Sequence, residues 1–149
     1  MSLAVAYIEN HGCVTFKKVT GGTEIQTYLY NLKPGKHGFH IHEKGTIEDG
    51  CDSLCSHYNP HNAKHGGRND DRYNRHVGDL GNLDVNEFGN CNTKFVDNLV
   101  KIEGKYSVIG RSVIIHEDED DLGKGENEES LKTGNSGKRI ACGRIEIIA

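Results

Sequence analysis

Polar and apolar residues alternate with a period of two along much of the chain. Ile25, Thr27 and Leu29 alternate with more polar or aromatic neighbours, and the runs "RSVIIH" and "RIEIIA" are rich in β-branched side chains. Because successive side chains of a strand point to opposite faces, this pattern predicts strands with one buried face. We expect strands near residues 3–9, 14–20, 24–32, 38–42, 82–86, 94–102, 108–116 and 139–148. No segment combines helix caps with an apolar face, so the predicted fold class is all-β, an eight-stranded antiparallel barrel or sandwich.

Two long segments interrupt this alternation. Residues 43–81 and 117–138 are rich in glycine and charge. Structureless loops longer than ~12–15 residues are uncommon in compact domains and are usually functional or disordered. Histidines are dense in and beside the first segment, at positions 42, 57, 61, 65 and 76. We therefore expect both loops to fold over a functional site.

Length and charge exclude several classes of protein. The 149 residues predict a single domain spanning 1–149. The net charge is −4 and no stripe of Lys and Arg occurs, which argues against a nucleic-acid partner. No apolar run approaches the ~20 residues of a membrane span, and no charged-then-apolar leader follows Met1. We expect a soluble, cytoplasmic protein without a membrane or nucleic-acid partner.

The histidines suggest a metal site. His40 and His42 lie two positions apart on a predicted strand, so both imidazoles point to the same face. Taken alone, the pair is more typical of two surface histidines on an exposed sheet face. However, further candidate ligands follow, namely His57, His65, His76, Asp79 and His116. Sites with several imidazoles suit Cu, Zn, Fe or Ni, and a carboxylate among them favours zinc. Because the candidates exceed what one ion can use, we expect two neighbouring ions.

The motifs "HGFHIHEKG", "HYNP", "KHGG", "RHVGDLGN", "HEDEDDLGKG", "NEESLKTGN" and "RIACG", in this order, resemble the copper,zinc superoxide dismutase family. The resemblance implies a Greek-key β-barrel. It also implies copper bound by His40, His42, His57 and His116, and zinc bound by His57, His65, His76 and Asp79. His57 would bridge both ions, Asp120 would bond the outer nitrogens of His40 and His65, and His37 would pack behind them. His11 is expected at the surface and His61 has no assigned role.

The resemblance further implies the activity, which is disproportionation of superoxide to O2 and H2O2 by a copper redox cycle. His57 would release copper on reduction, take up a proton and donate it, while Arg139 would position the anionic substrate. The residues Glu128, Glu129, Lys132 and Thr133 match the family's channel rim. Leu131 is more apolar than the residue usually found there. The 117–138 segment carries eight acidic residues against three lysines, so any steering of an anion depends on the local field at the cleft.

Five cysteines leave at least one thiol unpaired within the chain. The resemblance implies a Cys51–Cys142 disulfide. A second disulfide between Cys13 and Cys91 is a hypothesis, since the turns holding them should share one pole of the barrel. Cys51 and Cys55 could instead form half of a zinc site, although no second cysteine pair has the required spacing.

The resemblance also implies a homodimer and leaves room for a copper chaperone as partner. Val5, Ile109, Gly110 and Ile147 fit the family's dimer contact, whereas Lys44 and Arg144 replace apolar residues there. Two buried, unpaired cations would be costly, so both must reach solvent or acidic partners.

Two other functions compete with the enzyme. One is a non-catalytic copper-binding module, such as the dismutase-like domain of a copper chaperone, or a copper store. The other is a disulfide-stabilised adhesion-type sandwich with incidental histidines. All four implied copper ligands and Arg139 are present, which favours the enzyme.

Overall fold

The computed structural model describes residues 2–149 as one curled antiparallel sheet of eight strands. The strands are β1 (Leu3–Ile8), β2 (Gly12–Val19), β3 (Gly22–Leu29), β4 (Gly35–His42), β5 (Asp79–Val85), β6 (Lys94–Asp97), β7 (Ser112–His116) and β8 (Arg139–Ile147). Three short 3-10 helices are η1 (Ile47–Asp49), η2 (Cys51–Ser53) and η3 (Glu128–Leu131), and residues 2–149 contain no α-helix. The predicted all-β class with eight strands is confirmed.

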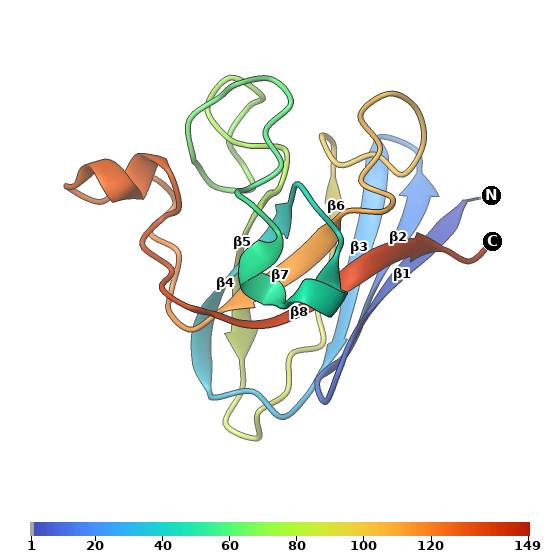
Figure 1. Cartoon of the computed structure of the whole chain (residues 1–149), viewed down its shortest axis with the longest axis horizontal. Helices are drawn as coiled ribbons and strands as arrows, with labels where there is room; N and C mark the ends of the chain where they lie inside the picture. Colours follow the sequence, from blue (N-terminus) through green and yellow to red (C-terminus); the bar gives the residue numbers. More distant parts are fainter. Residues whose placement is uncertain (1) are drawn as a thin grey trace.

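The strand order is β5-β4-β7-β8-β1-β2-β3-β6. The neighbours β4–β7 and β8–β1 are distant in sequence, so the chain crosses between the two halves of the sheet as in a Greek key. Figure 1 shows the strands curled into an open barrel, with the long green and orange loops extending beyond it. Within residues 2–149, no helix is long and apolar enough to span a membrane.

Two predicted strands are shorter than expected. The strand predicted at 94–102 ends at Asp97, because the Asp97 carboxylate accepts the backbone N–H groups of Leu99 and Val100 and turns the chain. The strand predicted at 108–116 begins only at Ser112. Gly110 has a φ of +84°, a conformation that a regular strand does not contain. Local hydrogen bonding and backbone conformation thus override the alternating pattern here.

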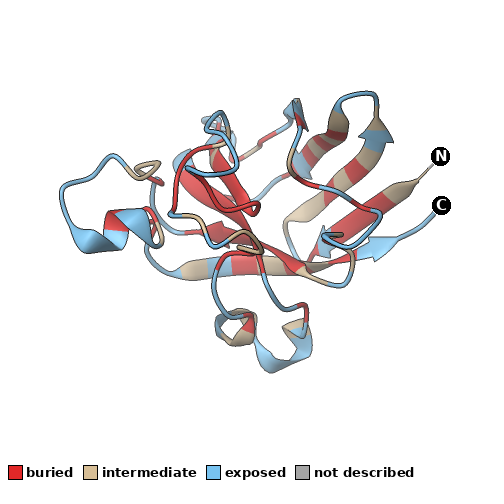
Figure 2. Cartoon of the chain, turned by 90° about the horizontal axis from the view of Figure 1, so that it is seen from above, coloured by how far each residue is buried: buried red, intermediate tan, exposed pale blue. Residues whose placement is uncertain are grey.

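The core lies inside the curl of the sheet. Alternate residues of β2 and β3 are buried, including Phe16 and Ile25, as the period of two predicts. β4 differs, because every residue from His37 to His42 is buried. Phe39 and Ile41 belong to the core. His40 and His42 point to the other face, where they bond to the long loops at Asp120 and at the Cys55 carbonyl. Figure 2 shows this burial concentrated in the strands.

A buried ion pair joins the first long loop to an edge of the sheet. The Arg75 guanidinium bonds both Asp97 carboxylate oxygens at 2.7 and 3.2 Å, and both residues are buried. It also donates to the carbonyls of Arg68 and Val77. Asp97 belongs to β6, which is an edge strand of the sheet. Arg75 therefore attaches the first long loop to this edge.

The cysteines follow one prediction and contradict two hypotheses. Cys51 and Cys142 form a disulfide that ties η2 to β8. Cys13 and Cys91 are both free. Both pair with adjacent residues of β3, Cys13 with Tyr28 and Cys91 with Leu29. Adjacent residues of a strand point to opposite faces, so the half-buried Cys13 lies on the other face from Cys91, which is buried in the core. The proposed second disulfide is therefore wrong. A zinc site using Cys51 is wrong as well, because its sulfur is already bonded.

Candidate metal centre

Four histidines from three separate segments meet at the end of the barrel. His40 and His42 come from β4, His116 ends β7, and His57 pairs with His42 through an isolated β-bridge. The His57 ring centroid lies 4.0 Å from that of His40 and 4.9 Å from that of His42. One ligand atom from each of the four lies within 4.8 Å of the others. The structure thus brings together all four predicted copper ligands.

Each of these imidazoles uses one ring nitrogen for the protein and leaves the other without a partner. Nδ1 of His42 donates to the Cys55 carbonyl at 2.8 Å, and Nδ1 of His116 donates to the Gly137 carbonyl at 3.1 Å. Among the described residues, the buried side-chain nitrogens without a hydrogen bond are His40 Nδ1, His42 Nε2, His57 Nε2, His65 Nδ1 and His116 Nε2, and of these only His65 Nδ1 lies close to a carboxylate, that of Asp79. Buried polar atoms are normally hydrogen-bonded, so this set points to ligands for ions.

A second group of ligand atoms surrounds the carboxylate of Asp79. Its Oδ1 lies 2.9 Å from His57 Nδ1, 2.9 Å from His65 Nδ1 and 3.1 Å from His76 Nδ1. These separations approach the ~3.3 Å between donors around a tetrahedral ion with bonds of ~2.0–2.1 Å. Ligand atoms within 4.8 Å of one another also group His40 with His57, His65 and Asp79. The two groups share His40 and His57, and the second group does not include His76, which contacts Asp79 Oδ1 through its Nδ1.

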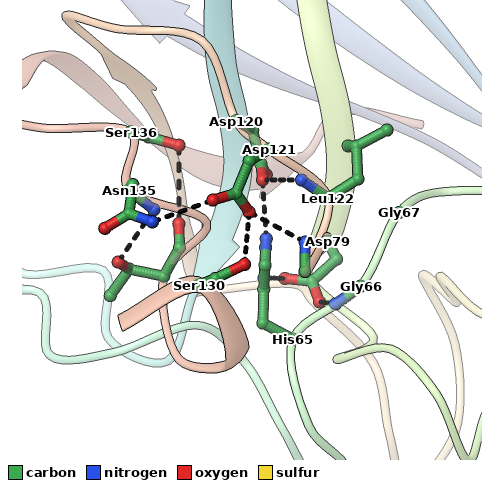
Figure 3. A network of polar contacts seen from close by, with 12 residues as sticks. His65, Gly66, Gly67, Asp79, Asp120, Asp121, Leu122, Ser130, Asn135 and Ser136 are labelled. Carbon is green, nitrogen blue, oxygen red and sulfur yellow. Dashed lines mark hydrogen bonds and ion pairs between the residues drawn. The ribbon is translucent and has the colours of Figure 1, made fainter. Parts of the chain in front are cut away.

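Asp120 joins the two groups from behind. Its Oδ2 lies 2.6 Å from His40 Nε2, and its Oδ1 lies 2.7 Å from His65 Nε2. Figure 3 shows this carboxylate between His65 and the loop that carries it. Sequence reasoning did not identify Asn82, whose side chain accepts from the Asp120 N–H and donates to its carbonyl. Asn82 ends the motif "RHVGDLGN", but its contact with Asp120, 38 residues away in sequence, is seen only in the fold.

A further network shapes the second long loop. Asp121 accepts the Ser130 hydroxyl at 2.7 Å and the Asn135 side-chain amide at 2.8 Å. Asn127 caps η3 by accepting the Ser130 N–H, and it also accepts from Asn135. Sequence reasoning missed these residues because their pairing depends on how the loop closes (Figure 3).

Burial keeps most of the copper-group imidazoles neutral. Burial and the nearby His57 lower the pKa of His40 to about 3, and burial lowers the pKa of His116 to about 4. Burial likewise lowers the pKa of His42 and of His57. A neutral imidazole has a lone pair available for a metal ion.

The carboxylates in the site are held ionised. Burial opposes ionisation of Asp79 and Asp120, but hydrogen bonds from the surrounding histidines outweigh it and lower both pKa values. For His65, burial opposes protonation, yet hydrogen bonds to the same two carboxylates raise its pKa to about 9. The second group thus combines fixed negative charge with imidazoles, the donor set that suits Zn²⁺.

A cavity of about 380 Å³ opens onto the first group. It is lined by His42, Ser56, His57, His116, Glu129, Thr133, Asn135, Gly137 and Arg139. The Arg139 guanidinium donates to the carbonyls of Cys51 and Cys55 at 3.0 and 2.6 Å. Burial lowers the pKa of this guanidinium, which nevertheless remains a cation at neutral pH. A fixed positive charge therefore stands at the entrance to the buried imidazoles.

Of the four predicted rim residues, two line the cavity and two do not. Glu129 and Thr133 line the cavity, and the Thr133 hydroxyl donates to the Glu129 carboxylate at 2.7 Å. Glu128 and Lys132 are exposed on the same η3 segment but do not line the cavity.

The remaining histidines stand outside both groups. His37 belongs to β4 and is buried, with Nδ1 2.8 Å from the His116 carbonyl and Nε2 2.7 Å from the Lys33 carbonyl. His61 packs edge-to-face on the Tyr106 ring.

Comparison with known proteins identifies the family to which this histidine-rich β-barrel belongs. Residues 10–145 match the family described as copper/zinc superoxide dismutase. The chain is 47% identical over 145 residues to a superoxide dismutase [Cu-Zn] of Paramecium bursaria Chlorella virus 1, covering 95% of this chain and 76% of that protein. It is 50% identical over 138 residues to an extracellular superoxide dismutase [Cu-Zn] of Drosophila melanogaster, covering 91% and 75%. A solved structure titled as the clock protein EA4 superposes with a TM-score of 0.93 and 43% identity, covering 99% and 95%.

The chain belongs to the copper/zinc superoxide dismutase family. It is an oxidoreductase that disproportionates superoxide to O2 and H2O2, and its cofactors are copper and zinc. The two groups of ligands favour this function over a non-catalytic copper-binding module, and the family match excludes an adhesion-type sandwich.

Proposed function

We propose the following roles for individual residues of this enzyme. Copper is held by His40, His42, His57 and His116, and zinc by His57, His65, His76 and Asp79, with His57 shared. The set of unpartnered buried nitrogens carries this assignment, because four of the five belong to the four copper ligands. His76 belongs to the zinc set because its Nδ1 lies against the carboxylate oxygen shared by His57 and His65.

When bound, copper supplies the one-electron redox chemistry and zinc supplies a fixed positive charge. Arg139 binds superoxide at the cavity mouth through its guanidinium, whose orientation is set by two backbone carbonyls. His57 would hold a proton at Nε2 only while that nitrogen is not bound to copper, and it would donate this proton to the product peroxide, with solvent supplying the second proton of H2O2. Asp120 orients His40 and His65 by accepting from their outer nitrogens.

The ligand assignment is tested by elemental analysis and superoxide decay on the same reconstituted sample. We expect one copper and one zinc per chain with fast decay. His116→Ala should lose copper and activity but keep zinc, and His76→Ala should weaken zinc binding. His61→Ala, a histidine outside both groups, is the matched control. Retention of full zinc affinity in His76→Ala would overturn the zinc set.

We propose a homodimer that uses the face containing Ile109, Gly110 and Ile147. Ile147 is 51% exposed at the end of β8, next to the exposed Ile148. Lys44 is exposed, and the Arg144 guanidinium is paired with Glu48 and Glu146, so neither cation is buried without a partner. Each cation therefore reaches solvent or an acidic partner, as a stable interface that contains them requires.

Sedimentation velocity tests the dimer. Ile147→Asp should shift the protein toward monomer, because a carboxylate would be buried at the interface. Phe88→Asp, at a residue that is 77% exposed in the β5–β6 connection, should leave the assembly unchanged. A monomer in the unsubstituted protein at micromolar concentration would refute the proposal.

We further propose a cytoplasmic location, a single domain spanning 1–149 and delivery of copper by a chaperone. The relatives do not decide the location, since the Drosophila melanogaster relative is named extracellular. The four copper ligands are each at most 4% exposed, so a delivery partner has to act on an opened loop. Subcellular fractionation tests the location, and a single cooperative unfolding transition tests the domain. Copper occupancy with and without co-expressed chaperone tests the delivery.

A further inference from the structure

A second cavity lies behind the metal centre and is distinct from the substrate cavity. It has a volume of about 280 Å³ and is lined by segments of β4, β5 and both long loops. It shares no lining residue with the cavity that contains Arg139. Figure 3 places two of its lining residues, Leu122 and Gly67, on one side of Asp120 and the substrate-cavity residue Asn135 on the other.

Three cations from three separate segments line this second cavity. Lys36 comes from β4, Arg68 from the first long loop and Lys124 from the second. Within residues 2–149, none of the three forms an ion pair at 4.0 Å or less. Unpaired cations that converge on a hollow repel one another, and a bound anion would relieve that repulsion.

One of the cations is held in place by packing. The Arg68 guanidinium lies 3.9 Å above the Phe95 ring centroid, and its backbone carbonyl accepts from Arg75. A stacked guanidinium loses little further freedom when it binds a ligand, which favours recognition of oxyanions by arginine. The two lysines are exposed and flexible, so they can adjust to the charge of the ligand.

The lining of the cavity holds one carboxylate against three cations. Asp70 is the only carboxylate in the lining, and its Oδ2 already accepts the Gly67 N–H at 2.8 Å. Asp84 stands opposite Lys36 in the β4–β5 register, but the two do not form an ion pair. The floor of the cavity includes Gly81, whose missing side chain leaves room for a ligand.

We propose that this cavity binds a small, doubly charged tetrahedral oxyanion of the phosphate class. Lys36, Arg68 and Lys124 provide the charge. The bound anion would also contact Asn82, the residue that holds the Asp120 backbone by two hydrogen bonds. Because Asp120 orients a histidine of each metal group, occupancy of the cavity stabilises the closed arrangement of both long loops without blocking the substrate cavity.

The probe is inorganic phosphate, titrated at constant ionic strength into the reduced, diamagnetic holoenzyme and followed by backbone amide NMR shifts. We expect saturable shifts at Gly81, Asn69 and Leu122. Lys36→Gln and Lys124→Gln should each weaken this binding about tenfold, since each removes one charge-assisted hydrogen bond. Lys17→Gln, the same change on β2, should leave the affinity unchanged. The superoxide decay rate without phosphate should be equal in all three variants, which shows that the variants are folded.

Two outcomes would overturn the proposal. One is a set of phosphate-dependent shifts confined to Gly137 and its neighbours, which would mean that phosphate binds only beside Arg139. The other is an unchanged affinity at Gly81 in both Lys36→Gln and Lys124→Gln. Neither result would bear on superoxide disproportionation, because the two cavities are lined by different residues.

Discussion

At the scale of single residues, Asp120 links the two metal groups. Asp120→Asn keeps the size of the side chain but offers one acceptor oxygen in place of two. His40 and His65 cannot then both keep the hydrogen bond they now make. Loss of such an outer contact typically costs 10–100-fold in metal affinity, so we expect zinc to bind about 10–100-fold more weakly. Competition with a zinc chelator measures the change.

Asp118→Asn is the matched control for this substitution. Asp118 lies two residues earlier, is exposed, and has no side-chain bond to a metal-group histidine. The zinc affinity of the Asp118→Asn protein should equal that of the unsubstituted protein. If both substitutions weaken zinc binding equally, the effect comes from the charge of the acidic run and not from orientation of the imidazoles.

Arg139 is the second residue whose role can be isolated. Arg139→Gln removes the cation at the cavity mouth, and we expect kcat/KM for superoxide to fall about tenfold or more, because local charge steers the anion. Arg139→Lys keeps the charge but cannot reach both carbonyls of Cys51 and Cys55, so its loss should be smaller. Pulse radiolysis at several salt concentrations measures both. An unchanged salt dependence in Arg139→Gln would contradict steering by this residue.

At the scale of structural elements, the Cys51–Cys142 disulfide holds η2 against β8. Its partners are 91 residues apart, and closing such a loop contributes about 4–5 kcal/mol to the free energy of unfolding in the chain-entropy model. Cys142→Ser should therefore lower the stability of the metal-free protein by a few kcal/mol. It should also lower activity, since Arg139 donates to the Cys51 carbonyl.

Denaturant unfolding of the metal-free protein checks this prediction. Cys13→Ser is the control, because Cys13 is free and lies away from the metal groups on β2. Equal unfolding midpoints for Cys142→Ser and the unsubstituted oxidised protein would show that the disulfide does not stabilise the fold.

The buried Arg75–Asp97 pair joins the first long loop to the edge strand β6. Arg75→Met removes one partner and leaves a buried carboxylate without its cation, so we expect a loss of about 3–5 kcal/mol in unfolding free energy. Lys18→Met provides the contrast. It breaks the exposed Lys18–Glu103 pair and should have little effect, because solvent screens that pair. Equal losses in the two variants would contradict a structural role for Arg75.

At the scale of the whole molecule, the sequence predicts most of the fold, and the structure brings the predicted ligand residues together at one end of the barrel. Strand alternation identifies eight strands, and the spacing of His40 and His42 places two imidazoles on one face. Chain reversals that depend on local side-chain bonds, such as the one made by Asp97, are not visible in that pattern.

Contacts between distant segments are equally hidden from the sequence. Asn82 and the Cys55 carbonyl both support the centre through partners far away in sequence, Asp120 and His42, and no sequence pattern shows these pairings. The Cys13–Cys91 hypothesis failed for a related reason. Proximity at one pole could be inferred, but not that the two side chains lie on opposite faces of the sheet.

Removal of the metals tests how far the centre contributes to the stability of the whole chain. Five imidazole nitrogens of the site are buried without a hydrogen bond, and bound ions would satisfy them. A ligand at 1,000 times its dissociation constant stabilises the native state by about 4 kcal/mol. For a chain of this size, each kcal/mol raises Tm by about 2–4 °C. We therefore expect chelation of zinc alone to lower Tm by about 8–16 °C, and zinc restored without copper to recover that loss but not the activity. Differential scanning calorimetry on matched samples measures both steps, and an unchanged Tm after complete zinc removal would show that the loops close without the ion.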